Sequence, residues 1–331
     1  AVKQQTPEFL QQAKTLLMLP DYFGFRLTGN KLSEYTNGST TQLVNPDTFQ
    51  WDKELIRKLG YPEDIFLPLQ MPGTKVGQLL PEIQKEVGFD LEVVLCGSHD
   101  TASAVMAVPQ TEGDGIYISS GTWSLMGIES LKPVITEDAA AANFTNEGGY
   151  NHRFRFLKNI MGLWMIQSVR HEYNDAYSFA QLCDMAEESK EFPSRVDVND
   201  QSFLSPDSMV EAIRQYCHKT GQPVPESVGE LTSVVYRSLA QSYGETVRGL
   251  EKIAGKTYDS IHIIGGGSNA AYLNQLTADA TGKTVYAGPG EATAIGNLLA
   301  QMIHAGDLAD LKSARKCVRE SFEIKTFAPA K

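Results

Sequence analysis

The chain has 331 residues, of which 42% are hydrophobic and 21% charged, a balance typical of soluble globular proteins. Its formal net charge of −11 argues against nucleic acid or an anionic membrane as a partner, because both bind clusters of Lys and Arg. No apolar run approaches the roughly 20 residues that span a bilayer. The four cysteines are too widely spaced for a zinc site or a disulfide scaffold, so we expect a protein of the reducing cytoplasm.

The first 90 residues are predicted to be mainly helix and loop. Residues 7–19 carry apolar side chains at helical spacing, and residues 51–59 form a second, shorter helical pattern. Residues 28–50 are rich in Thr, Asn, Ser and Gly, which is typical of loops. The first predicted strand lies near residue 91, and the chain opens on Ala1, so we expect it to be the rear part of a longer protein.

From residue 91 onward, strands and helices alternate, which indicates an α/β fold. Residues 115–119 and 124–128 are predicted to be the arms of a hairpin. Residues 159–172 and 231–254 are predicted to be helices, and the second has one continuous apolar stripe.

Two predicted strands near the end, 261–264 and 284–287, each lead into a glycine turn and a helix. We place a domain boundary where Pro109 closes a short helix, which divides the chain into residues 1–109 and 110–331.

Asp100 is the first candidate catalytic residue, because its turn lies between an apolar strand and a short helix. A carboxylate there can act as a general base, but an Asp at a helix start is more often an N-cap, and the local sequence favours that interpretation. The neighbouring His99 could hydrogen-bond a ligand or simply pack. Cys96 fits a buried strand residue better than a catalytic thiol, because the sequence pairs no base with it.

Two glycine-containing turns are candidate nucleotide contacts. Residues 119–124 offer hydroxyls and backbone amides that can surround phosphates, although an ordinary hairpin turn is slightly favoured. Gly265, Gly266 and Gly267 end a strand, so a ligand could approach the backbone there. A tight strand-to-helix turn explains them equally well, and they match neither the dinucleotide fingerprint of a Rossmann dehydrogenase nor a P-loop.

Asn159 and Gln167 lie eight positions apart on one predicted helix, so they are expected to share a face. Their amides could bind a sugar and a nucleotide. They could equally be solvated polar groups on the helix surface.

In combination, these segments resemble the FGGY family of carbohydrate kinases, and most closely its rhamnulokinase branch. The resemblance rests on matched runs spread over nearly the whole chain: Tyr35–Leu43, Gly97–Val105, Ser119–Gly127, Asn146–Gly149, Leu157–Trp164 and Gly288–Ala292. The run Lys158–Trp164 is specific to the rhamnulokinase branch.

The resemblance implies an α/β protein with the two-domain actin-like ATPase (ribonuclease H-like) fold. It implies transfer of the ATP γ-phosphate to the 1-hydroxyl of L-rhamnulose in L-rhamnose catabolism, with Mg²⁺, and no residue of this chain is assigned as a metal ligand. Asp100 becomes the proton acceptor and a sugar contact. The other implied sugar contacts are His99, Thr101 and Asn159, and the implied ATP contacts are Thr122, Gln167, Gly265, Gly266 and Gly267.

One departure from the family pattern qualifies this hypothesis. Family members begin with a strand–hairpin that grips phosphates and metal, and nothing before residue 91 matches it, so we expect the first domain to be incomplete. Whether the chain is active alone stays open. The alternatives are a kinase for another ketose, such as fuculose or xylulose, and a fragment that binds ATP or ADP without catalysis.

Overall fold

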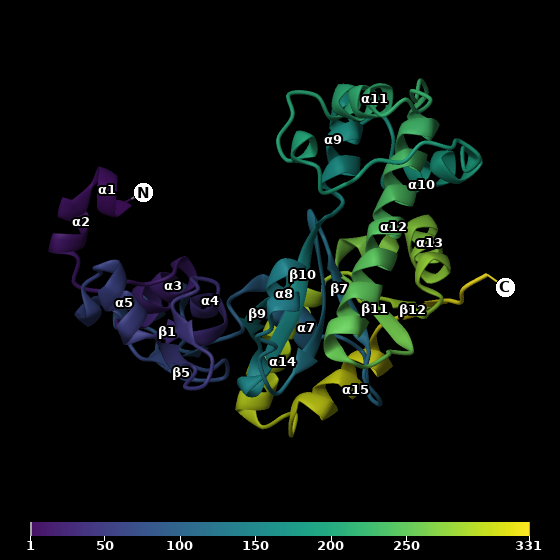
Figure 1. Ribbon diagram of the computed structural model, residues 1–331. Coiled ribbons are helices and arrows are strands. Elements are labelled where there is room, and N and C mark those ends of the chain that lie inside the picture. The colour runs from purple at the N-terminus through teal and green to yellow at the C-terminus, as the bar shows by residue number, and fades with distance from the viewer. Residues whose placement is uncertain (1, 331) are drawn as a thin grey trace.

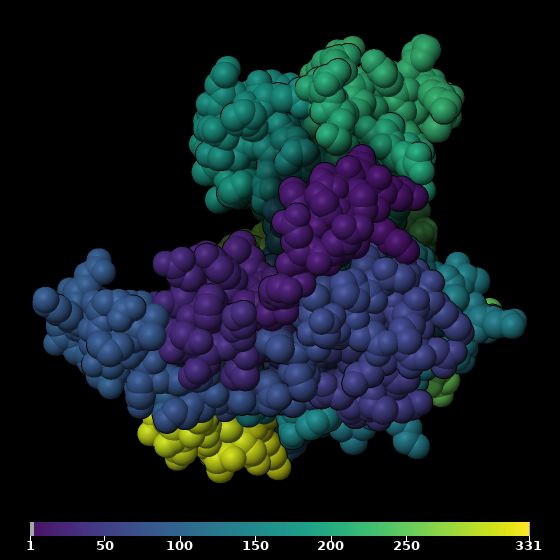
Figure 2. Space-filling view, turned by 90° about the vertical axis from the view of Figure 1, so that its left-hand side faces the viewer, coloured from purple at the N-terminus to yellow at the C-terminus, as the bar shows by residue number. Residues whose placement is uncertain are grey.

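The computed structural model describes residues 2–330, and it places an N-terminal region of short elements beside a large central sheet (Figure 1). A helical lobe, built from residues 164–227, rises above the sheet. Figure 2, which views the N-terminal region face on, shows the same lobe above it. None of the helices between residues 2 and 330 is both long and apolar enough to cross a membrane.

The N-terminal region consists of short helices and strands that pair only in twos. The helices are α1 (Val2–Gln5), α2 (Pro7–Gln12), α3 (Leu19–Thr28), α4 (Tyr35–Ser39), α5 (Lys53–Leu59), η1 (Glu63–Ile65) and α6 (Pro81–Val87). The parallel pair is β1 (Ser33–Glu34) with β4 (Leu69–Gln70). The antiparallel pairs are β2 (Val44–Asn45) with β3 (Gln50–Trp51), and β5 (Lys75–Gln78) with β6 (Glu92–Val94). A small core forms around Tyr35, Trp51, Ile56 and Leu69.

The central sheet has seven strands in the order β13-β12-β11-β7-β8-β10-β9. Their bounds are β7 (Ile116–Ser120), β8 (Trp123–Ser130), β9 (Thr145–Gly148), β10 (Phe154–Met161), β11 (Ser260–Ile264), β12 (Thr284–Ala287) and β13 (Lys325–Phe327). Strand β11 runs parallel to β7 and β12, and the other pairings are antiparallel.

The remaining helices cover the sheet or build the lobe. They are α7 (Asp100–Met106), α8 (Glu137–Ala141), η2 (Tyr150–His152), α9 (Trp164–Glu172), α10 (Phe179–Glu188), η3 (Gln201–Phe203), α11 (Met209–Lys219), α12 (Val228–Ala254), η4 (Gly266–Asn269), α13 (Ala271–Thr281), α14 (Ala292–Ala305) and α15 (Leu311–Ser321). Helix α12 begins with a capping box of Ser227 and Glu230 and ends at Gly255 in the left-handed conformation. Both ends of its polar backbone are therefore satisfied.

Alternating side chains give the sheet two differently covered faces. One face carries Ile118, Phe156 and Ile263 in a core that includes α12 and α13. The other carries Tyr117 and Leu157 in a core formed with α7, α14 and α15. Helix α7 therefore packs among helices that follow it by about 190 residues or more in the chain.

Gly296 brings α14 into direct contact with α7. A Cβ atom added at Gly296 would lie 1.8 Å from the carbonyl oxygen of Ser103, so only glycine fits at this crossing. The turn that carries Asp100 is thereby held against the C-terminal part of the chain. The domain boundary at residue 109 stays a prediction.

Much of the predicted secondary structure is confirmed. The hairpin is β7–β8, the helix predicted over 231–254 is α12, and the strand predicted over 284–287 is β12. The helix predicted over 7–19 is wrong beyond Gln12. Residues 13–18 are not helical, and Leu16 instead forms a parallel bridge with Phe66 before α3 begins with Pro20 in its first turn. The loops predicted over 28–50 contain α4, the two-residue strands β1 and β2 and the first residue of β3, and strands this short show no period.

The helix predicted over 159–172 is wrong in its first part. Residues Phe154–Met161 form β10, and α9 begins only at Trp164. Gly162 allows this change of direction, because a Cβ atom there would lie 2.5 Å from the carbonyl carbon of Trp123. Asn159 and Gln167 therefore lie on different elements and do not share a helix face.

Candidate active site

A pocket of about 540 Å³ brings the start of α7 together with the β7–β8 hairpin and strands β9 and β10. Five of the predicted site residues line it, namely His99, Asp100, Thr101, Thr122 and Asn159. Its other lining residues are Ser119, Gly121, Trp123, Leu125 and Glu147. Gln167 and the three glycines at 265–267 are not among the residues that line it.

Strand pairing explains why residues distant in sequence meet here. Leu125 of β8 is paired with Ser119 of β7 and with Asn159 of β10. Directly paired residues of antiparallel strands point to the same face of a sheet. The hairpin and β10 therefore present these side chains together toward the N-terminal end of α7.

Asp100 is the first residue of α7, and its side chain is 77% exposed. The N-cap position belongs to His99, which makes no side-chain capping bond. The backbone N–H of Thr101 donates to Oδ1 of Asp100 over 2.6 Å, and the Thr101 hydroxyl approaches the same oxygen at 3.2 Å. The N-cap interpretation is therefore wrong in geometry, and the carboxylate is accessible from the pocket.

His99 is held from behind by a buried ionic pair. Nη2 of Arg155 lies 2.8 Å from Nδ1 of His99 and 3.0 Å from Oε2 of Glu147. A guanidinium can only donate, so Nδ1 accepts and the ring proton sits on Nε2. Burial, followed by the charge of Arg155, lowers the pKa of His99. The neutral imidazole therefore directs its Nε2–H toward Asp100, whose Oδ1 is 3.7 Å away.

Arg155 was not among the site residues predicted from the sequence. Its side chain is fully buried, and its Nε also donates to the carbonyl of Gly148 over 3.0 Å. A signal was present, because a charged residue stands between Phe154 and Phe156 in a strand whose residues are mostly apolar. A buried cation requires a partner, but the sequence alone does not say which one.

Glu34 is a second residue that the sequence analysis missed. Its carboxylate is fully buried and accepts hydrogen bonds from the Ser98 amide at 3.1 Å and the Ser98 hydroxyl at 2.7 Å. It also accepts from the amide and hydroxyl of Thr36. Burial raises the pKa of Glu34 despite these bonds. Glu34 thus ties the 97–101 turn to the N-terminal region.

The glycine run at 265–267 has a clear packing role. Gly265 has a φ of +84°, and a Cβ atom on Gly267 would lie 1.9 Å from Oγ of Ser120. These two glycines therefore let the turn pack against the end of β7. A Cβ atom on Gly266 would meet nothing within 4 Å, so this glycine faces open space.

Helix α9 starts directly at the hairpin turn. The backbone amides of Leu163 and Trp164 donate to the carbonyls of Gly121 and Thr122 at 3.0 and 3.1 Å. Gln167 lies in the first turns of α9 and is partly buried. The hairpin turn, α9 and the glycine run are therefore packed around the end of β7.

Cys96 and the other cysteines show no sign of catalysis or bridging. All four are free thiols, and burial raises the pKa of Cys96, which disfavours the reactive thiolate. Within residues 2–330, no three His, Cys, Asp or Glu side chains converge as a metal site would require.

Sequence comparisons identify related proteins along the whole chain. The C-terminal domain profile of the FGGY family of carbohydrate kinases matches residues 116–305, and the N-terminal domain profile matches residues 2–107. A rhamnulokinase of Halalkalibacterium halodurans is 52% identical over 330 residues, which is 100% of this chain and 70% of the relative. A rhamnulokinase of Bacillus subtilis is 46% identical over 329 residues, 98% of this chain and 67% of the relative.

Solved structures agree on the fold. A xylulose kinase from Rhodospirillum rubrum superimposes with a TM-score of 0.72 at 14% identity, covering 99% of this chain and 66% of that one. A Plasmodium falciparum glycerol kinase with ADP gives 0.75 at 16% identity, with the same coverage. The chain thus has the predicted actin-like ATPase fold and spans about two thirds of the length of these structures.

Proposed function

Because the chain belongs to the FGGY family of carbohydrate kinases, we propose that its protein transfers the γ-phosphoryl group of ATP to the 1-hydroxyl of L-rhamnulose. The observation that carries this proposal is the exposed carboxylate of Asp100 facing the hydroxyl-bearing hairpin turn in one pocket. The choice of sugar is supported by the rhamnulokinases that are 52% and 46% identical to this chain.

In the proposed reaction, Asp100 orients the sugar hydroxyl and accepts its proton as the new O–P bond forms. The bond between the γ-phosphorus and the β,γ-bridging oxygen breaks, and ADP leaves with that electron pair. His99 offers Nε2–H and Asn159 an amide as hydrogen-bonding groups for the sugar. Thr101 steadies the Asp100 carboxylate through its amide and hydroxyl.

For ATP, the proposed contacts are Thr122, Gln167 and the glycine run at 265–267. Gly266 is the glycine of that run with open space above its α-carbon, so a ligand can approach its backbone. The described residues offer no cage of three ligating side chains for Mg²⁺. Magnesium commonly keeps its waters and is held by substrate phosphates with one or two carboxylates. Mg²⁺ bound to ATP in that way would neutralise phosphate charge.

The test is a coupled assay of ADP formation with L-rhamnulose, L-fuculose and D-xylulose, beside calorimetry of ATP binding on the same preparation. We expect ATP to bind and L-rhamnulose to give the highest kcat/KM. Preference for another ketose would reject the sugar assignment. ATP binding without turnover on any ketose would instead favour a nucleotide-binding chain without catalysis.

A further inference from the structure

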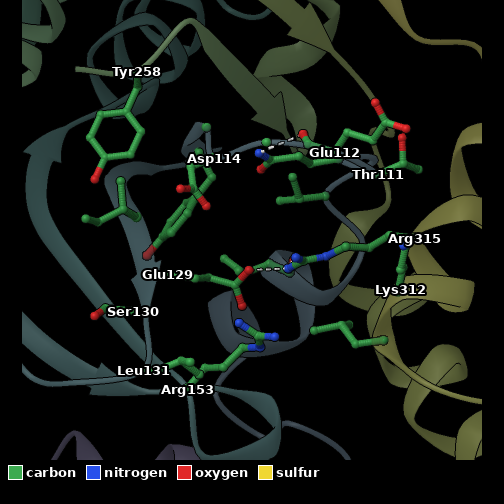
Figure 3. Close-up of a pocket in the computed structure, with 18 of the residues that line it drawn as sticks. Thr111, Glu112, Asp114, Glu129, Ser130, Leu131, Arg153, Tyr258, Lys312 and Arg315 are labelled. Carbon is green, nitrogen blue, oxygen red and sulfur yellow. Dashed lines mark hydrogen bonds and ion pairs between the residues drawn. The ribbon is translucent and has the colours of Figure 1, made fainter. Parts of the chain in front are cut away.

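A second pocket, shown in Figure 3, is larger than the candidate active site, and its residues on the β7–β8 hairpin lie farther from the hairpin turn. Its volume is about 690 Å³, within the range of metabolite-binding pockets. It lies between the end of β8, the 110–115 loop, the segment after α12 and the start of α15. On β8, Leu125 lines the candidate active site and Ile128 lines this pocket, three positions or about 10 Å apart along the strand.

Three buried polar atoms on residues that line this pocket have no hydrogen-bond partner among the described residues. They are Oη of Tyr117, Nε of Arg153 and Nε of Arg315. Tyr117 is only 2% exposed. Buried polar groups are nearly always hydrogen-bonded in folded proteins, and all three of these atoms can donate. A ligand group with acceptor oxygens would therefore satisfy all three donors.

The charges in the pocket also favour an anion. Its lining holds four cations and three acids in a chain of net charge −11. Arg315 pairs with Glu129 and also donates to the carbonyl of Val105 over 3.0 Å. Arg153 and Lys312, in contrast, form no ion pair with any described residue. Figure 3 shows Arg153 and Arg315 reaching toward Glu129 from different elements.

The positive potential extends to the neighbouring strand. Burial, and then the charges of Arg315 and Arg319, lower the pKa of His262 on β11 to about 4. His262 lies directly beneath the pocket wall, because a Cβ atom on Gly115 would meet its ring at 3.0 Å. The charges of Arg315 and Arg319 therefore act on His262 in addition to its burial.

We propose that this pocket binds a small metabolite through an oxyanion, a phosphate or a carboxylate, held by Arg153 and Arg315. Guanidinium groups suit both anions, because their N–H groups can form paired bonds to two oxygens. The Tyr117 hydroxyl supplies a further donor, and Lys312 at the rim adds attraction. Val134, Leu131 and Tyr258 provide apolar surface for the remainder of the ligand.

Calorimetric titration of the purified protein with inorganic phosphate, and separately with citrate, tests this site and tells the two anion classes apart. Arg153→Met should weaken binding of the preferred probe at least tenfold, because this guanidinium has no protein partner to lose. Lys316→Met is the matched control. Lys316 lies on the same helix as Arg315 but outside the pocket, where it pairs with Glu320 at 3.7 Å. The Lys316→Met variant should bind the probe with the affinity of the wild type.

For a second variant, we expect the affinity for the probe to change in the opposite direction. Glu129→Gln keeps an acceptor for Arg315 but removes the negative charge, so the probe should bind severalfold more tightly. His99→Ala changes only the candidate active site and should leave the affinity unchanged, which separates this proposal from the proposed function. Equal affinity in the wild type and Arg153→Met, weaker binding by Glu129→Gln, or no heat with either probe at millimolar concentration would overturn the proposal.

Discussion

Arg155 and His99 are joined by a 2.8 Å hydrogen bond between Nη2 and Nδ1 that connects the buried interior of the central sheet to the turn that carries Asp100. The pairing of β9 with β10 places Glu147 directly opposite Arg155. The guanidinium is thus charge-balanced on one side and hydrogen-bonded to the imidazole on the other. The orientation of His99 is therefore set by strand register.

Replacing Arg155 with Met should raise the pKa of His99, because the nearest positive charge is lost while Glu147 and Asp100 remain. It should also destabilise the fold by about 3–5 kcal/mol, since the Glu147 carboxylate is left buried without its partner. NMR titration of the imidazole and urea unfolding measure the two effects.

The double variant Arg155→Met/Glu147→Gln is the control for this prediction. It should recover much of the stability, yet its kcat/KM for the ketose should stay about 10²-fold low, because His99 is no longer held in place. An imidazole that titrates in Arg155→Met as it does in the wild type would show that Arg155 does not set the state of His99.

Asp100→Asn should lower kcat by about 10²–10⁴-fold, the usual contribution of a general base. ATP affinity should change less than twofold, and stability by less than about 0.5 kcal/mol, because the side chain is largely exposed. Steady-state kinetics and calorimetry check both. Asp184→Asn, at an exposed position on α10, is the matched control and should leave kcat, ATP affinity and stability unchanged. Turnover by Asp100→Asn close to that of Asp184→Asn would remove Asp100 as the base.

The close crossing of α7 and α14 can be tested with a pair of glycine substitutions. Gly296→Ala places a methyl group 1.8 Å from the Ser103 carbonyl, so the helices must separate, at a cost of about 1–3 kcal/mol. Gly249→Ala in α12 meets only a ring atom of Phe144 at 3.9 Å and should stabilise by about 0.4–1 kcal/mol. Thermal unfolding compares the two. Changes of the same sign would contradict the crossing as described.

Asp21 should make stability depend on pH between about 4 and 6. Burial is the main cause that raises its pKa from 3.8 to about 6, so the folded chain holds a proton that the unfolded chain has released. The contribution of this group is therefore fully present below pH 4 and is lost as the pH rises through 6.

Asp21→Asn should remove that dependence. The variant should unfold a few degrees above the wild type at pH 8, with a difference that narrows toward pH 4. Glu34, whose pKa is also raised by burial, leaves a residual slope. Asp259→Asn, at an exposed position, is the control. A melting difference that stays constant over this pH range would show that Asp21 is not the titrating group.

Local patterns predicted the elements that are long and regular. The apolar stripe of α12 and the alternation around the β7–β8 turn are visible in the sequence because each side chain repeats the same environment. Strand β10 was not predicted, and its last residues were assigned to a helix, because both of its faces are largely buried and its apolar residues resemble a helix segment. Two-residue strands such as β1 have no period to detect.

The residues of the candidate site that lie in polar turns or family motifs were predicted from the sequence, whereas the buried charged residues behind them were not. Asp100, Thr122 and Asn159 lie in polar turns or motifs that resemble a known family, and all three line one pocket. The ATP contacts proposed at Gln167 and the glycine run stay predictions. Arg155 and Glu34 were not predicted as site residues, because a single charged residue that is buried only in the folded chain forms no recognisable sequence motif.

By itself, then, the sequence determined the family and the α/β class and pointed to the polar turns as candidate site segments, because these depend on residue type and short-range spacing. Only the tertiary structure decided which charges meet. Arg155 reaches His99 across 56 residues, and Glu34 reaches Ser98 across 64. Such contacts arise from strand register and helix crossings, and the free energy of burying a charge depends on a partner whose distance no linear pattern encodes.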